Sequence, residues 1–139
     1  MLAKGRGEIL TPLPSFPQTY VVLAKPMLGV STAWVYNNYD QSKVAKHPET
    51  AMVIEELQKK NSQGIAALLC NVLESVTIKK YNEISLLKEK MLEFGASASL
   101  MSGSGPTVFG LVDTKEQAEE LATRLEQITS AKIIVTRTV

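Results

Sequence analysis

The chain has 139 residues, a net charge of +1, and 45% hydrophobic against 21% charged residues. This length suits one domain with a buried core, and the composition is that of an ordinary soluble globular protein. The balanced charge and an aromatic content of 6% argue against a nucleic-acid partner, because such surfaces need clustered basic residues with exposed aromatics.

Targeting signals and cysteine content indicate the expected compartment of the protein and the expected role of its cysteine. The first residues give no secretory signal, and no apolar run approaches the roughly 20 residues of a membrane span, so we expect a cytoplasmic protein with no membrane partner. Cys70 is the only cysteine, which excludes an internal disulfide and a cysteine-based zinc site. Its leucine neighbours on a predicted helix favour an inert thiol in the core.

The first elements expected along the chain are strands. Residues 6–10 predict a short strand at the main sheet or its edge, and a proline-rich connection follows over residues 11–17. The β-branched and apolar residues 19–24 predict a buried strand. A helix is then expected to about residue 39, capped by Ser31 or Thr32, because either hydroxyl can accept a bond from an unpaired amide.

Three amphipathic helices are expected in the middle of the chain. They span residues 49–60, 65–76 and 83–94, where apolar residues recur at helical spacing. Asn71 and Glu74 lie three residues apart, so they would be neighbours on the second of these helices. We expect Asn71 to be a buried hydrogen-bonding residue rather than a ligand-binding one.

The C-terminal third predicts a hairpin, a helix and a last strand. Strands are expected over residues 98–101, 107–112 and 132–139. Thr114 with Gln117 three residues later is a capping-box pattern that begins the helix between the last two strands.

The order of elements predicts the fold class. From residue 19 onward it is strand, several helices, strand, tight connection, strand, helix, strand. This is the order of a ferredoxin-like α+β sandwich, in which an antiparallel sheet packs against helices. The first helical position is enlarged into several helices.

The sequence Ser102-Gly103-Ser104-Gly105-Pro106-Thr107 joins the two strands of the hairpin. Two glycines let the backbone fold tightly and leave amides uncovered, so the loop can hold an anion or press against another loop that does. It is neither a P-loop nor a dinucleotide fingerprint, because it lacks Gly-Lys-Ser/Thr and the third glycine, and a strand follows it. On these residues alone, a plain glycine-rich connection is the competing interpretation.

Four segments carry a resemblance to a known family. Residues 100–109, Leu-Met-Ser-Gly-Ser-Gly-Pro-Thr-Val-Phe, resemble the third motif of the GHMP kinases. The other three are Gly-Arg-Gly-Glu at residues 5–8, Lys-Pro at 25–26 with Gly-Val-Ser-Thr-Ala-Trp-Val-Tyr at 29–36, and Asn-Val-Leu-Glu at 71–74. They are similar to the branch of that family that phosphorylates 4-diphosphocytidyl-2-C-methylerythritol in non-mevalonate isoprenoid biosynthesis. Val72 stands where that branch has an acidic residue.

The resemblance implies a partial kinase. It matches residues 1–139 to the C-terminal, substrate-binding domain, and the N-terminal domain with the ATP-binding motif and the catalytic lysine and aspartate is absent. ATP and Mg²⁺ would then belong to the intact enzyme, with neither tightly bound to this chain. We expect the isolated chain to be inactive, its partner to be the missing N-terminal kinase domain, and a dimer to be possible through the exposed cleft surface.

The resemblance also implies site residues. Thr32 would present its hydroxyl to the diphosphate of the cytidine-diphosphate-linked substrate, and Tyr36, one turn later, would stack on the cytosine. Simple capping by Thr32 and packing by Tyr36 are the alternatives. Trp34 is expected to pack. The cleft loop would consist of Ser102, Gly103, Ser104, Gly105 and Thr107.

No catalytic residue and no metal ligand is predicted within the chain. The only aspartates, Asp40 and Asp113, fall beside helix ends, and the only histidine, His47, precedes a proline in an exposed turn. Phosphoryl transfer needs a phosphate cradle, charge neutralisation and an orienting carboxylate, which these residues do not provide.

One alternative function remains open from the sequence. A stand-alone ferredoxin-like module would use the same glycine loop to bind a small anion or to regulate another protein. A partial kinase should expose an apolar patch where its other half packs, whereas a stand-alone module should be polar there.

Overall fold

A computed structural model describes all 139 residues. The elements follow in the order β1 (Leu2–Lys4), β2 (Ile9–Thr11), β3 (Tyr20–Lys25), α1 (Thr32–Asn37), the 3-10 helix η1 (Gln41–Lys43), α2 (Thr50–Gln58), α3 (Ser62–Leu68), α4 (Glu74–Lys80), α5 (Asn82–Glu93), β4 (Ala98–Met101), β5 (Val108–Val112), α6 (Lys115–Ile128) and β6 (Lys132–Arg137).

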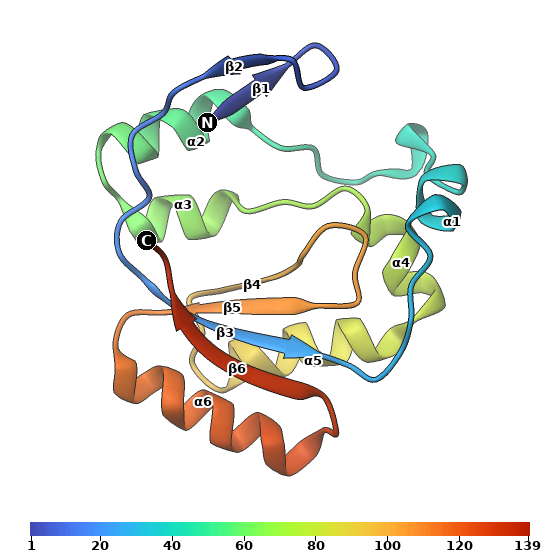
Figure 1. Cartoon of the computed structure of the whole chain (residues 1–139), viewed down its shortest axis with the longest axis vertical. Coiled ribbons are helices and arrows are strands. Elements are labelled where there is room, and N and C mark those ends of the chain that lie inside the picture. The colour runs from blue at the N-terminus through green and yellow to red at the C-terminus, as the bar shows by residue number, and fades with distance from the viewer.

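The main sheet has four strands in the order β4-β5-β3-β6, and every neighbouring pair is antiparallel. Helices α5 and α6 lie against one face of this sheet, and α2 and α3 lie on the other side (Figure 1). Strand β3 is one of the two inner strands, and its Leu23 is opposite both Phe109 of β5 and Ile134 of β6. This is the topology of the predicted ferredoxin-like sandwich, so the expected fold class is confirmed.

Alternation along the strands divides the apolar residues between the two faces of the sheet. Val22 and Val108 point toward α5 and α6, where they join Met91 and Leu121 in a fully buried core. A smaller cluster on the opposite face joins Ala66 of α3 to the sheet, with Ala98 and Leu111 as its buried strand residues. Val108 is the first residue of β5 after the glycine loop. The larger core therefore holds in place the end of the sheet from which this loop extends.

The N-terminal strand differs from the prediction. The strand expected at residues 6–10 begins only at Ile9, and it pairs with Leu2–Lys4 in a separate two-stranded sheet instead of extending the main one. Gly5 and Gly7 both have positive φ, so residues between them turn the chain back on itself. The prediction was wrong because it treated this turn as strand.

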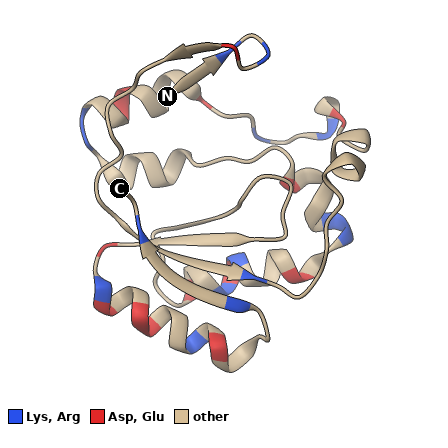
Figure 2. Cartoon of the chain, viewed as in Figure 1, with Lys and Arg blue, Asp and Glu red and all other residues tan.

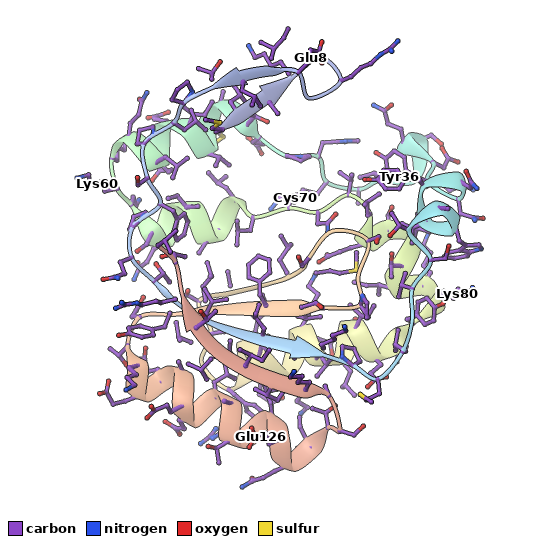
Figure 3. The ribbon with its side chains drawn as sticks, viewed as in Figure 1. Glu8, Tyr36, Lys60, Cys70, Lys80 and Glu126 are labelled. Carbon is purple, nitrogen blue, oxygen red and sulfur yellow. The ribbon has the colours of Figure 1, made fainter.

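The single helix expected over residues 65–76 is two helices, α3 and α4. The chain leaves the helical conformation at Leu69, whose ψ is 131°, and the next helix, α4, begins at Glu74. Asn71 stabilises the break, because its Oδ1 accepts a hydrogen bond from the amide of Leu73 at 3.1 Å. Cys70 lies on this extended segment (Figure 3) and is half-buried, so its expected place on a core helix was wrong.

Several other expectations hold. Helix α6 begins with the predicted capping box, in which Thr114 and Gln117 bond each other's backbone amides. Ser31 is the residue that caps α1, through a 3.2 Å bond from the amide of Trp34, and the helix ends at Asn37, before the expected residue 39. The outer side of α6 carries interspersed acidic and basic residues (Figure 2). No helix is long and apolar enough to span a membrane.

Candidate functional site

The glycine loop is a tight, internally bonded turn between β4 and β5. The amide of Ser102 donates to the carbonyl of Thr107 at 2.8 Å, and the amide of Gly105 donates to the carbonyl of Ser102 at 3.0 Å. Gly103 and Gly105 have φ values of +56° and +88°, which residues with a side chain rarely adopt. The sequence therefore gives this loop its shape through its two glycines, as expected.

Two consecutive backbone amides of the loop have no acceptor within the chain. The amides of Gly103 and Ser104 donate neither to the backbone nor to a side chain. Both residues lie outside the helices and strands, with Gly103 exposed and Ser104 half-buried. Neighbouring free amides of this kind can bind an anionic oxygen.

The hydroxyls of Thr32 and Ser104 lie 2.8 Å apart and share a hydrogen bond. Because Ser31 provides the cap of α1, the hydroxyl of Thr32 remains free for this contact. The expected substrate segment and the glycine loop are thus adjacent in space, although 72 residues separate them in the sequence. Of the two residues proposed from sequence for capping α1, Ser31 takes that role.

The aromatic residues of α1 differ in exposure. Tyr36 lies on α1 (Figure 3), and its side chain is 61% exposed. Its ring is therefore available to a flat ligand. Trp34 packs against the main core, as expected, and Lys80 lies 4.0 Å from the centroid of its ring.

The loop is also held from the side of α4. The buried hydroxyl of Thr77 donates to the carbonyl of Ser104 at 3.1 Å. Asn71 donates from its Nδ2 to the carbonyls of Met101 and Gly103, at 2.8 and 2.7 Å. The expected hydrogen-bonding role of Asn71 is confirmed, but the residue is half-buried and precedes α4 rather than sharing a helix with Glu74. Sequence reasoning missed Thr77, whose only signal is a polar residue on the apolar face of α4.

The ionisable residues of the chain are dispersed. Asp40 caps η1 and accepts two hydrogen bonds from Ser42, which hold the pKa of its carboxyl below the ordinary value. Asp113 and His47 are exposed, as expected for His47. No group of three or more His, Cys, Asp or Glu side chains is arranged to hold a metal ion.

The glycine loop, Thr32 and Tyr36 do not line any of the hollows of the surface.

The sequence of residues 53–130 matches the family described as "GHMP kinases C terminal". That match covers more than half of the chain. The chain belongs to the GHMP kinase C-terminal family.

Curated relatives of this GHMP kinase domain include kinases of one named kind. It is 54% identical over 112 residues to the 4-diphosphocytidyl-2-C-methyl-D-erythritol kinase of Geobacillus kaustophilus (strain HTA426), covering 81% of this chain and 38% of that protein. The enzyme of the same name from Acetivibrio thermocellus (strain ATCC 27405) is 48% identical over 118 residues, covering 85% and 42%. The GHMP kinase domain thus spans about two fifths of the length of these curated relatives.

Solved structures agree with this assignment. The crystal structure of 4-(cytidine 5'-diphospho)-2C-methyl-D-erythritol kinase superposes with a TM-score of 0.76 at 27% identity, covering 99% of this chain and 49% of that one. Homoserine kinase from Cytophaga hutchinsonii superposes with a TM-score of 0.73 at 20% identity, covering 93% and 44%, which shows a shared fold.

Proposed function

We propose that residues 1–139 are the substrate-binding C-terminal domain of an ATP-dependent kinase, which transfers the γ-phosphate of ATP to the 2-hydroxyl of 4-diphosphocytidyl-2-C-methyl-D-erythritol. The names of the relatives at about half identity support this substrate. The observation that carries the proposal is the 2.8 Å bond between Thr32 and Ser104, since it joins the segment that resembles the substrate side to the glycine loop.

Each site residue receives a role in this proposal. The hydroxyls of Thr32 and Ser104 exchange their mutual bond for bonds to the substrate diphosphate. The exposed ring of Tyr36 stacks on the cytosine. The loop from Ser102 to Thr107 lines the nucleotide side of the cleft.

The chain's own residues fit phosphate oxygens but not a metal ion. The free amides of Gly103 and Ser104 are donors for a phosphate. No carboxylate cluster is arranged to hold Mg²⁺, so we derive no step through the metal. We propose that ATP and Mg²⁺ are bound chiefly by the N-terminal kinase domain, which is the partner of this chain.

We also propose that these 139 residues alone do not catalyse phosphoryl transfer. The chain spans only 38% of the Geobacillus kaustophilus kinase. The sheet face opposite α5 and α6 bears an apolar hollow of about 310 Å³ lined by residues that include Leu23 and Phe109. Such a face suits packing against the other half of a kinase, or a dimer of this chain in its absence.

Calorimetric titration tests the substrate assignment. We expect the chain to bind cytidine 5'-diphosphate about fivefold or more tightly than pyrophosphate, a difference of about 1 kcal/mol, because the ring of Tyr36 stacks on the base. Tyr36→Ala should remove that preference, and Met27→Ala, at another exposed apolar residue, should keep it. Equal affinity for the two ligands would instead favour the stand-alone anion-binding module.

An ADP-release assay tests the proposed incompetence. With ATP, Mg²⁺ and the cytidyl substrate present, the chain alone should release no ADP above the rate without protein. Sustained turnover by the chain alone would overturn this part of the proposal.

A further inference from the structure

We propose that Asn71 and Glu74 are positioning residues that aim the free amide of Ser104 outward from the glycine loop. Lys88 of α5 holds Glu74 in place for this task. The functional meaning of the inference rests on the proposed function, in which this loop lines the cleft.

The last residue of β4 shows how the loop is anchored. Strand β4 is at the edge of the sheet, so its outer backbone groups have no neighbouring strand. At Met101 two side chains take that place. The carboxylate of Glu74 accepts from the amide of Met101 at 2.8 Å, and Asn71 donates to its carbonyl at 2.8 Å. The two groups fix the backbone where the loop begins.

Glu74 is itself fixed by an ion pair. Its second carboxylate oxygen lies 2.6 Å from Nζ of Lys88, and the side chains are 17% and 21% exposed, respectively. The other ion pairs of the chain join residues three or four apart along one helix, whereas this pair joins α4 to α5. A polar network therefore runs from Lys88 through Glu74 to the end of β4.

Asn71 extends the network into the loop. Its Nδ2 also donates to the carbonyl of Gly103 at 2.7 Å. The only cis peptide bond in the chain joins Gly105 to Pro106, so the bond between Gly103 and Ser104 is trans. In a planar trans peptide the C=O and N–H point in opposite directions. Anchoring the carbonyl of Gly103 on Asn71 therefore directs the amide of Ser104 away from Asn71.

Amide exchange and NMR spectra of the whole chain test this inference. In Asn71→Ala we expect the amides of Ser102 and Gly105 to exchange about tenfold faster, because the loop loses its anchor. The amide signals of Gly103 and Ser104 should shift, while the exchange of the β3 amides stays unchanged. A residue that only adds global stability would accelerate β3 and the loop together.

Variants of Glu74 provide a second test, which does not depend on the folding of Asn71→Ala. Glu74→Gln keeps an acceptor for the amide of Met101 but loses the ion pair with Lys88, so its loop should change less than that of Glu74→Ala. Glu93→Gln is the matched control, because it breaks the 2.6 Å pair with Lys90 on α5 far from the loop. It should leave the loop signals unchanged.

The outcomes are distinct. Loop amides that match the wild type in both Asn71→Ala and Glu74→Ala would overturn the positioning role, as would equal changes across β3 and the loop. If Asn71→Ala does not fold, the two Glu74 variants decide. The amide measurements are made without ligand, so they do not depend on the proposed substrate. If the chain fails to prefer cytidine 5'-diphosphate, the proposed substrate is contradicted but the positioning role of Asn71 and Glu74 is not.

Discussion

The side-chain oxygens of Thr32 and Ser104 lie 2.8 Å apart, which links the start of α1 to the loop between β4 and β5. A double-mutant cycle of Thr32→Val and Ser104→Ala should give a coupling energy of about 0.5 kcal/mol in the free energy of unfolding. The value falls at the low end for a hydrogen bond because water reaches both hydroxyls. Urea denaturation of the four proteins measures it.

The control for this cycle is Thr123→Val. The hydroxyl of Thr123 donates at 2.9 Å to the carbonyl of Glu119 within α6, so its loss is confined to one helix. It should show no coupling to Ser104→Ala. A coupling near zero for Thr32 as well would mean that the two hydroxyls act independently.

The two glycines of the loop should respond differently to alanine. At Gly105 a Cβ would lie 2.9 Å from Sδ of Met101 and 3.3 Å from Cγ2 of Thr77, in addition to the positive φ. We expect Gly105→Ala to lower the free energy of unfolding by about 3 kcal/mol, from backbone strain and overpacking together. At Gly103 a Cβ meets open space, so Gly103→Ala should cost about 1 kcal/mol, from the backbone alone.

Gly29 provides the comparison for both variants. Its φ is not positive and a Cβ there meets nothing within 4 Å, so Gly29→Ala should change the free energy of unfolding by less than about 0.5 kcal/mol. Thermal and urea unfolding give the ranking. If Gly103→Ala lowered the free energy of unfolding as much as Gly105→Ala, the close packing around Gly105 would add nothing to the cost of backbone strain.

The sequence predicted those elements whose signals are local. The capping box of Thr114 and Gln117 needs only residues three apart, and it appears in the structure as expected. The break before α4 combines the local bond between Asn71 and Leu73 with contacts of Asn71 to Met101 and Gly103, some 30 residues away. Apolar spacing continued through the break, so periodicity alone predicted one long helix.

The candidate site was predictable in its parts and not in its assembly. The motif resemblance identified both Thr32 and the glycine loop, but no pattern in the sequence gives their mutual hydrogen bond. The Glu74–Lys88 pair is similar, because the two residues lie 14 apart on different helices. Long-range partners of this kind follow from the packing of α4 and α5 and not from spacing.

Removal of the α6 cap should weaken the whole domain. Thr114 accepts the amide of Gln117 at 3.2 Å, and Leu121 and Leu125 bury the inner face of the helix against the sheet. Thr114→Ala should lower the free energy of unfolding by about 1 kcal/mol, because an amide at the helix start loses its acceptor. Gln127→Ala, near the exposed end of the same helix, is the control and should be close to neutral. Equal effects of the two in urea unfolding would contradict a role for the cap.

The carboxyl of Asp40 should titrate below an ordinary aspartate, chiefly because the hydroxyl of Ser42 donates to it at 2.6 Å, with the Ser42 amide at 3.0 Å next and Lys43 a smaller cause. A depressed folded-state pKa means that this contribution to stability is present above the unfolded-state pKa of about 3.9 and is lost as the pH falls through the folded-state pKa. Ser42→Ala should raise the pKa of Asp40 toward its ordinary value. Lys43→Met should raise it less, since the pair distance is 3.4 Å and both side chains are exposed to water. Carboxyl carbon NMR titrations measure both, and a larger rise in Lys43→Met would show that charge, rather than hydrogen bonding, controls this group.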